Sequence, residues 1–200
     1  MINGYNQIYL GLLPKLSECD FKEIAERLGF KYISSGKIAI DFLGRGYIIT
    51  PDGVTAADGE PTNVNFRNVI LYYVLSAGSG EPKYSFVPLH RLTGMIAGSH
   101  AITDKIMNAP LIREFDNNIE RLKSSVSVLG GVYEGMIRGS HSWLINVLPK
   151  IPVKFIFYET DEEFPADIQI MLDETAPSFM DFECLAFLCG CLVSALTGKK

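Results

Sequence analysis

The stretch from Leu148 to Glu183, LPKIPVKFIFYETDEEFPADIQIMLDETAPSFMDFE, decides how this chain folds. It contains two runs, VKFIFYE and ADIQIML, in which apolar and polar residues alternate with the period of two that is typical of β-strands. An acidic segment with a proline separates the runs, and a helix start follows at about Asp181. Together with SWLINVL just upstream, this pattern predicts an antiparallel meander over residues 142–173 and then a final helix.

Helical signals dominate the segments upstream of the meander. Asp20 can serve as a helix N-cap with Glu23 three residues later, and Gly29 can supply a left-handed stop, so the pattern predicts a helix over residues 20–28. Apolar residues at helical spacing predict further helices near residues 8–16, over residues 66–74 and from Asn117 to Leu129. Another helix could start at Ser99 or Thr103, and Pro110 interrupts it. We therefore expect an α+β fold, with helices packed on one face of a curved antiparallel sheet and a C-terminal strand meander and final helix.

The segment KIAIDFLGRGYIITPDG predicts a β-hairpin. Apolar and polar residues alternate on both sides of Gly44, Arg45 and Gly46, and Asp52 with Gly53 forms the closing turn. A glycine-rich phosphate loop would need a following helix to present its N-terminal amides, and no helix pattern follows here. A hairpin turn is sufficient to explain the glycines.

Length and charge limit the classes of protein that this chain can represent. Its 200 residues fit a single domain spanning 1–200, which buries about 70% of its unfolded surface without metal or disulfide support. The loop Ser76–Pro82 is too short to separate domains. With 18 Lys and Arg against 23 Asp and Glu, the net charge is −5 and no basic stripe forms, so we expect no nucleic-acid partner.

The sequence also predicts a location for the protein. Its longest apolar stretch, Cys184 to Leu196, is shorter than the roughly 18 to 20 residues that span a bilayer, so we expect a buried core helix and no membrane association. The N-terminus has neither a positive region nor a small-residue cleavage site. Because Cys19, Cys184, Cys189 and Cys191 fit a set of free thiols, a cytoplasmic, reducing setting is the expectation.

Short segments distributed along the chain carry a family resemblance. They are FLGR (42–45), NVILYYVL (68–75), FVPLHRL (86–92), LGG (129–131), LPKIPV (148–153), DEEFP (161–165), MLD (171–173) and the FECLAFL helix. In this order they resemble the prokaryotic domain of unknown function family 3786. The resemblance implies an anaerobic context, because relatives look like proteins of anaerobic bacteria and archaea, some lying near corrinoid or one-carbon genes and some fused to a cysteine-rich iron–sulfur segment.

The chain departs from this family pattern at three places. No four-cysteine cluster precedes the domain, so an iron–sulfur assignment does not transfer and we expect no cofactor. GMIAGSHAI stands where relatives have an aromatic-rich segment, near residue 97. Ser178 stands where relatives tend to carry a histidine, and a metal site built on that histidine is not expected here.

Carboxylates around DEEFP form the most conspicuous candidate site. If the two strands pair, Asp161, Glu163 and Asp173 could converge at one end of the sheet and bind a hard cation, or act as acid and base, with Glu162 and Asp167 beside them. The alternative is a solvated turn whose charges protect a sheet edge from aggregation. We favour the solvated turn, because charge clusters usually face solvent.

Other reactive residue types give weaker signals. On a helix Cys184 and Cys191 share a face while Cys189 points elsewhere, which favours core packing over a metal or redox site. The histidines at positions 90, 100 and 141 form no HxxxH or HxH pair. Arg91 and His141 are retained as candidates for ligand contact.

Two functional hypotheses follow from these observations. No nucleophile elbow, metal quartet or nucleotide fingerprint is present, so the first is a non-catalytic accessory module that binds a small molecule or a partner protein in anaerobic corrinoid or one-carbon metabolism. The second is a divalent-metal-dependent hydrolase or lyase that works through the DEEFP carboxylates. Whether Asp161, Glu163 and Asp173 line a cleft or point outward from a turn distinguishes them.

Overall fold

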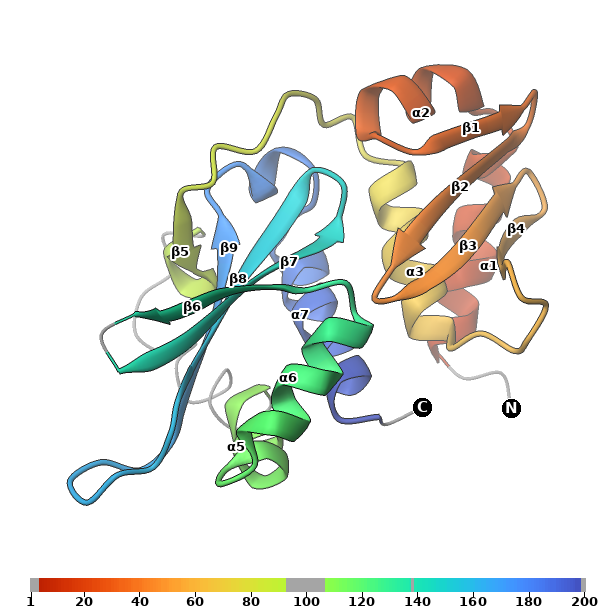
Figure 1. Cartoon of the computed structure of the whole chain (residues 1–200). Helices are drawn as coiled ribbons and strands as arrows, with labels where there is room; N and C mark the ends of the chain where they lie inside the picture. The colour runs from red at the N-terminus through yellow and green to blue at the C-terminus, as the bar shows by residue number, and fades with distance from the viewer. Residues whose placement is uncertain (1–3, 93–106, 138, 199–200) are drawn as a thin grey trace.

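Two antiparallel sheets organise the chain in a computed structural model, which describes residues 4–92, 107–137 and 139–198 (Figure 1). The first sheet follows chain order, with β1 (Lys31–Ser34), β2 (Lys37–Phe42), β3 (Arg45–Thr50) and β4 (Gly53–Ala56). The second has the order β5-β9-β8-β7-β6, from β5 (Phe86–Pro88), β6 (Val132–Ile137), β7 (Ser140–Leu148), β8 (Ile151–Tyr158) and β9 (Asp167–Asp173). The α+β class is confirmed, with the strands divided between two sheets.

The helices occupy the segments between and beside the strands. They are α1 (Gly4–Leu16), α2 (Phe21–Leu28), α3 (Val64–Val74), the 3-10 turn η1 (Leu89–Arg91), α5 (Ala109–Phe115), α6 (Ile119–Val128), the 3-10 turn η3 (Ala176–Ser178) and α7 (Phe182–Leu196). None of the helices within the described ranges is both long and apolar enough to cross a bilayer.

The predicted meander forms the centre of the second sheet. β7 pairs with β8 and β8 pairs with β9, both antiparallel, so that Trp143 lies opposite Phe155 and Phe155 opposite Ile170. All three side chains are buried, as the period-two pattern requires for one covered face. The acidic segment at residues 159–166 connects β8 to β9, which confirms the predicted connection.

Helix termini follow the predicted caps closely. The Asp20 side chain accepts hydrogen bonds from the backbone amides of Lys22 and Glu23, at 2.9 and 3.1 Å, and Gly29 ends α2 with a φ of 80°. Asp181 caps α7 in the same way. The cap residues therefore place both helix starts.

The local expectations have mixed outcomes. Pro110 lies in the first turn of α5, a position that favours proline, and residues 107–108 directly before this helix are also helical. The proposed start at Ser99 or Thr103 lies outside the described residues. Strands β1, β4, β5 and β6 were not expected, because edge strands such as β1, exposed along its whole length, show no alternation.

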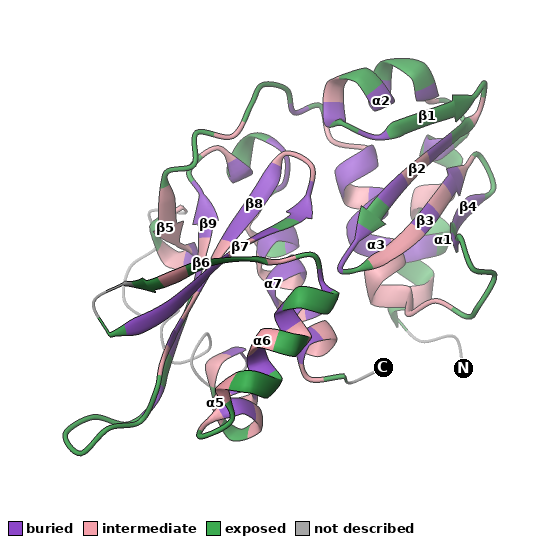
Figure 2. Ribbon diagram, in the orientation of Figure 1, coloured by how far each residue is buried: buried purple, intermediate pink, exposed green. Residues whose placement is uncertain are grey.

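Helix α7 lies between the two halves of the molecule (Figure 1). It runs along one face of the second sheet in Figure 1. It packs against α3, which itself contacts α1. The buried apolar side chains of both halves form one continuous cluster, and Figure 2 shows α7 and the central strands largely buried. The fold thereby brings α1, α3 and the start of α7 together.

Candidate functional site

The acidic loop between β8 and β9 is an exposed turn. Asp161 Oδ1 accepts hydrogen bonds from the backbone amides of Glu163 and Phe164, at 2.8 and 2.7 Å, and the Asp161 amide donates to the Phe164 carbonyl oxygen. The side chains of residues 159–165 are exposed. Asp161 thus shapes the loop through its own backbone, a typical role of aspartate in turns.

Asp173 does not join these carboxylates. Asp173 is the last residue of β9, whereas the acidic loop precedes the first residue of this strand. The seven residues of β9 therefore separate Asp173 from the acidic loop by about 20 Å. Asp173 is fully buried and accepts from the Lys83, Ser85 and Thr175 amides and from the Thr175 hydroxyl, the last at 2.6 Å. The convergence of Asp161, Glu163 and Asp173 that the sequence left open as the alternative to a solvated turn is therefore absent.

The hydrogen bonds decide the charge state of Asp173. Burial by itself raises the pKa of a carboxylate, but hydrogen bonds from Thr175, Lys83 and Ser85 outweigh it and hold the pKa of Asp173 below its usual value. The ionised carboxylate anchors the segment before β5 to the end of β9.

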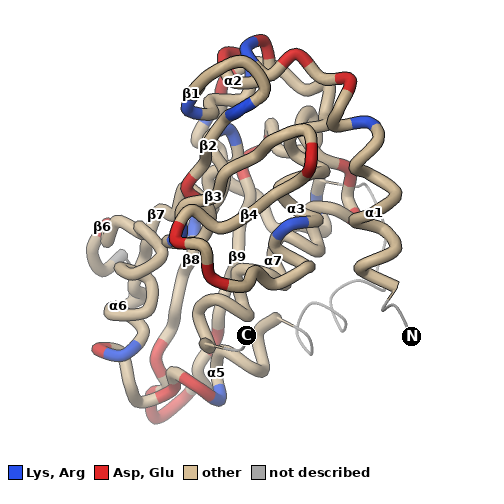
Figure 3. Tube along the Cα trace, turned by 90° about the vertical axis from the view of Figure 1, so that its right-hand side faces the viewer, with Lys and Arg blue, Asp and Glu red and all other residues tan. Residues whose placement is uncertain are grey.

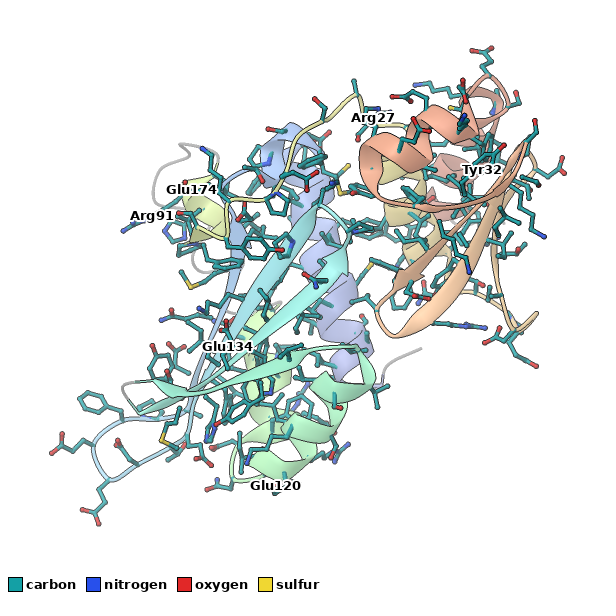
Figure 4. All side chains as sticks on the ribbon, turned by 45° about the horizontal axis from the view of Figure 1, so that its top comes forward. Arg27, Tyr32, Arg91, Glu120, Glu134 and Glu174 are labelled. Atoms are coloured by element: carbon teal, nitrogen blue, oxygen red, sulfur yellow. The ribbon has the colours of Figure 1, made fainter. Side chains whose placement is uncertain are left out.

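The two remaining predicted contact residues lie in different surroundings. His141 is buried on β7, with Nδ1 2.8 Å from the Tyr133 hydroxyl and Nε2 3.1 Å from a Glu159 oxygen. A neutral imidazole satisfies both partners, accepting from Tyr133 and donating to Glu159. Arg91 is exposed at the end of η1, and Figure 4 shows it at the edge of the molecule.

The three C-terminal cysteines are core residues, as their spacing predicts. Cys184, Cys189 and Cys191 are buried in α7, and burial raises the pKa of each thiol to about 12. They remain protonated at neutral pH and are poor nucleophiles and metal ligands in that form. Among the described residues, no group of three or more His, Cys, Asp or Glu side chains is arranged to hold a metal ion.

One hollow on the second sheet gathers charged side chains that compensate each other. It measures about 350 Å³ and includes Ser142 and Lys154. Glu134 Oε2 accepts from the Ser142 hydroxyl at 2.9 Å and lies 3.2 Å from Lys154 Nζ. Because the charges of Glu134 and Lys154 pair with each other, this cluster does not require a ligand to balance them.

A second hollow, between α1, α3 and the start of α7, is different. It measures about 300 Å³, and we call it the α7 hollow; its lining residues are Tyr5, Ile8, Asn68, Tyr72, Asp181, Glu183, Cys184 and Phe187. This volume is at the lower end of the range for small-molecule sites. Apolar and aromatic walls with a few polar groups are also the usual composition of such sites.

Asn68 supplies the most informative polar group of the α7 hollow. The residue is completely buried, and its Nδ2 donates to the Tyr5 carbonyl oxygen at 3.0 Å. That contact fixes the amide orientation, because a flipped amide would place two acceptors face to face. Oδ1 is then buried without a donor among the described residues. An unsatisfied buried acceptor costs about 1–3 kcal/mol, which a ligand or water that donates to it would recover.

The first turn of α7 makes one wall of the hollow acidic. Asp181 Oδ1 accepts from the Cys184 amide at 2.8 Å as the N-cap, and Glu183 follows in the first turn. Burial, followed by a hydrogen bond to Asp181, raises the pKa of the Cys184 thiol to about 12. None of the described lining residues is Lys or Arg. In Figure 3 the basic residues are scattered along the chain and form no band.

Aromatic rings from α1, α3 and α7 also line the hollow. Tyr5 of α1 stacks on Phe187 of α7, with ring centroids 5.6 Å apart and planes at 9°. Burial, with smaller contributions from Cys184 and Asp181, raises the pKa of Tyr72, so its hydroxyl stays neutral. The α7 hollow thus combines two carboxylates, an unsatisfied amide oxygen and three aromatic rings.

A family model described as Domain of unknown function (DUF3786) matches residues 20–195. The chain belongs to this family. The match confirms the resemblance seen in the sequence and covers all lining residues from Asn68 to Phe187, whereas Tyr5 and Ile8 precede it. Neither a curated protein nor a solved structure matches the chain.

Sequence reasoning about this DUF3786 domain overlooked the α7 hollow. Asp181 was seen only as a helix start, and Asn68, Tyr72 and Phe187 were seen only as parts of helical patterns. One signal was available: Asn68 sits in the apolar run NVILYYVL beside buried Val69 and Ile70. A polar side chain among buried helix positions requires hydrogen-bond partners, and this requirement marks it for attention.

Proposed function

We propose that this chain is a non-catalytic binding module that holds a small organic molecule in the α7 hollow. The observation that carries the proposal is the buried Oδ1 of Asn68, a lining residue of a hollow of ligand size, which has no donor within the described part of the chain. Binding sites commonly present a few fixed polar groups in an apolar enclosure, and such groups determine orientation and specificity.

The chemistry of the lining supports binding rather than covalent catalysis. Among the described lining residues, the Cys184 thiol is the best candidate for a nucleophile, but its pKa of about 12 leaves it protonated at neutral pH. Asp181 is engaged as the cap of α7. The assignment to anaerobic corrinoid or one-carbon metabolism rests on the family resemblance alone and belongs to the proposal.

The proposal is tested on the full chain by NMR titration with a panel of small amines, alcohols, amides and carboxylates. At least one class should produce saturable shifts of the Tyr72 and Phe187 resonances. Tyr5→Ala removes one aromatic wall and should weaken this binding by about tenfold, which is the effect of losing roughly 1.4 kcal/mol of contact.

Tyr84→Ala is the matched control, because Tyr84 is another exposed tyrosine that does not line the hollow. It should leave the affinity unchanged. Saturable shifts confined to other parts of the molecule, or no binding by any class, would refute the proposed function.

A further inference from the structure

We infer that the ligand of the α7 hollow is a small organic cation with N–H donors, namely a protonated primary or secondary amine on an aromatic or aliphatic body. This inference rests on the proposed function and specifies its ligand class. Three independent properties of the hollow carry it: the charge of its lining, the unsatisfied acceptor and the aromatic walls.

The charge of the lining favours a cation. Asp181 and Glu183 contribute two carboxylates, and no described lining residue is basic. The N-terminus of α7 lies at the same wall, and its helix dipole offsets part of the negative charge of the two carboxylates with about half a positive charge. The remaining negative charge attracts a cation and repels an anion.

The Asn68 amide oxygen specifies a donor. Asn68 lines the hollow, and Nδ2 of its amide is held by the Tyr5 carbonyl oxygen, so Oδ1 is the polar atom of this side chain that has no donor among the described residues. An ammonium group supplies up to three N–H donors, which suffice for Asn68 Oδ1 and for the carboxylates of Asp181 and Glu183. A quaternary ammonium carries the charge but cannot donate, and an alcohol donates but lacks the charge.

The aromatic rings distinguish an organic cation from a metal ion. Tyr5, Tyr72 and Phe187 all line the hollow, and the faces of such rings attract cations within about 6 Å. A hard divalent ion prefers six or more oxygen ligands, and aromatic carbon provides none. The apolar part of an amine can pack on the Tyr5–Phe187 stack, which lies beside the acidic wall.

The decisive experiment is isothermal titration calorimetry of the full chain at pH 7 with four probes that share a phenylethyl body and differ in the head group. They are 2-phenylethylammonium, its N,N,N-trimethyl derivative, 2-phenylethanol and 3-phenylpropionate. We expect the primary ammonium to bind at least tenfold more tightly than the alcohol and about tenfold more tightly than the trimethyl derivative, because a lost charged hydrogen bond has that effect. The carboxylate should not bind.

Substitutions test whether the preference for the ammonium arises from residues of the α7 hollow. Glu183→Gln keeps the shape of the side chain and removes one charge, so affinity for the primary ammonium should fall about fivefold, as for a partly exposed ion pair. Glu163→Gln removes an exposed charge from the distant acidic loop and should change nothing. Asn68→Leu removes one of the three acceptors and should reduce the preference for the primary over the trimethyl ammonium; if that variant does not fold, the Glu183→Gln comparison decides.

The possible outcomes separate this inference from the proposed function. If the alcohol or the carboxylate binds as tightly as the ammonium and shifts the Tyr72 and Phe187 resonances, the hollow is a binding site and the cation inference is wrong. If Glu163→Gln weakens binding as much as Glu183→Gln, the charge effect is not local and the inference is also wrong. If no probe and no member of the wider panel binds, the proposed function itself is wrong.

Discussion

The Tyr73 hydroxyl donates a hydrogen bond to the Leu28 carbonyl oxygen over 2.8 Å in the buried core. The same hydroxyl accepts from the Lys150 amide at 3.1 Å. One phenol therefore joins α3 to the end of α2 and to the turn between β7 and β8. Burial raises the pKa of Tyr73, so the group stays a neutral donor at physiological pH.

Tyr73→Phe should lower the free energy of unfolding by about 2–3 kcal/mol, because the substitution leaves a buried carbonyl oxygen and a part-buried amide without their partner. Urea denaturation followed by circular dichroism measures the difference. Tyr84→Phe, at an exposed tyrosine, should have almost no effect. A loss below about 0.5 kcal/mol for Tyr73→Phe would mean that water replaces the hydroxyl.

Gly44→Ala should destabilise the protein by about 3 kcal/mol. Leu43 and Gly44 form a two-residue turn between β2 and β3 with φ values of 49° and 74°, and a Cβ on Gly44 would lie 2.1 Å from the Val128 carbonyl oxygen at the end of α6. Left-handed strain contributes about 1 kcal/mol and the clash contributes the rest.

Gly59 provides the control for this substitution. It has a φ of 78°, but a Cβ there meets nothing within 4 Å. Gly59→Ala should therefore cost only the strain, about 1 kcal/mol. Equal losses at the two positions would show that the turn does not dock against α6 in solution.

Asp173→Asn should lower the free energy of unfolding by about 2–3 kcal/mol, because a buried charged acceptor of four hydrogen bonds becomes a neutral amide with only one acceptor oxygen. The pKa of Asp173 is lowered in the folded state, so its contribution is fully present above the unfolded pKa and is lost as the pH falls through the folded pKa. Stability measured from pH 5 down to pH 2 should fall less steeply in the variant. An unchanged acid slope would contradict the assignment of a lowered pKa.

Glu163→Gln should change stability by less than about 0.5 kcal/mol, because the side chain is exposed on the loop shaped by Asp161. Its thermal midpoint, like that of the unmodified chain, should not respond to magnesium, manganese or zinc. A rise of several degrees with one of these ions, lost in the variant, would revive the metal-dependent hypothesis, since selective binding to the folded state must stabilise it.

Alkaline pH should destabilise the protein partly through Cys189. Burial raises the pKa of this thiol from its usual 9.0 to about 12, so the unfolded chain loses the proton first and stability declines between pH 9 and 12. Each such thiol contributes about 1.4 kcal/mol per pH unit in this window. Guanidine denaturation of Cys189→Ala should show a correspondingly shallower decline, and a slope equal to that of the unmodified chain would exclude the thiol as the cause.

The sequence alone determined those features whose causes lie within a few residues of each other. The cap at Asp20, the left-handed stop at Gly29 and the cap at Asp181 are local hydrogen bonds and local backbone preferences. The meander over residues 142–173 follows from the alternation in adjacent strands, where a short connection leaves antiparallel pairing as the simple solution. These predictions needed no knowledge of distant segments.

The tertiary structure decided which polar groups became buried and which residues distant in the sequence came into contact. Asp173 and Asp161 look alike in the sequence, yet one is enclosed by a segment 90 positions away and the other shapes an exposed turn. Asn68 reaches Tyr5 across 63 positions, and Phe187 completes the same hollow from the last helix. Such contacts depend on how helices and sheets pack against each other. Hydrophobic periodicity does not encode this packing, because periodicity identifies the buried face of an element but not the element that covers that face.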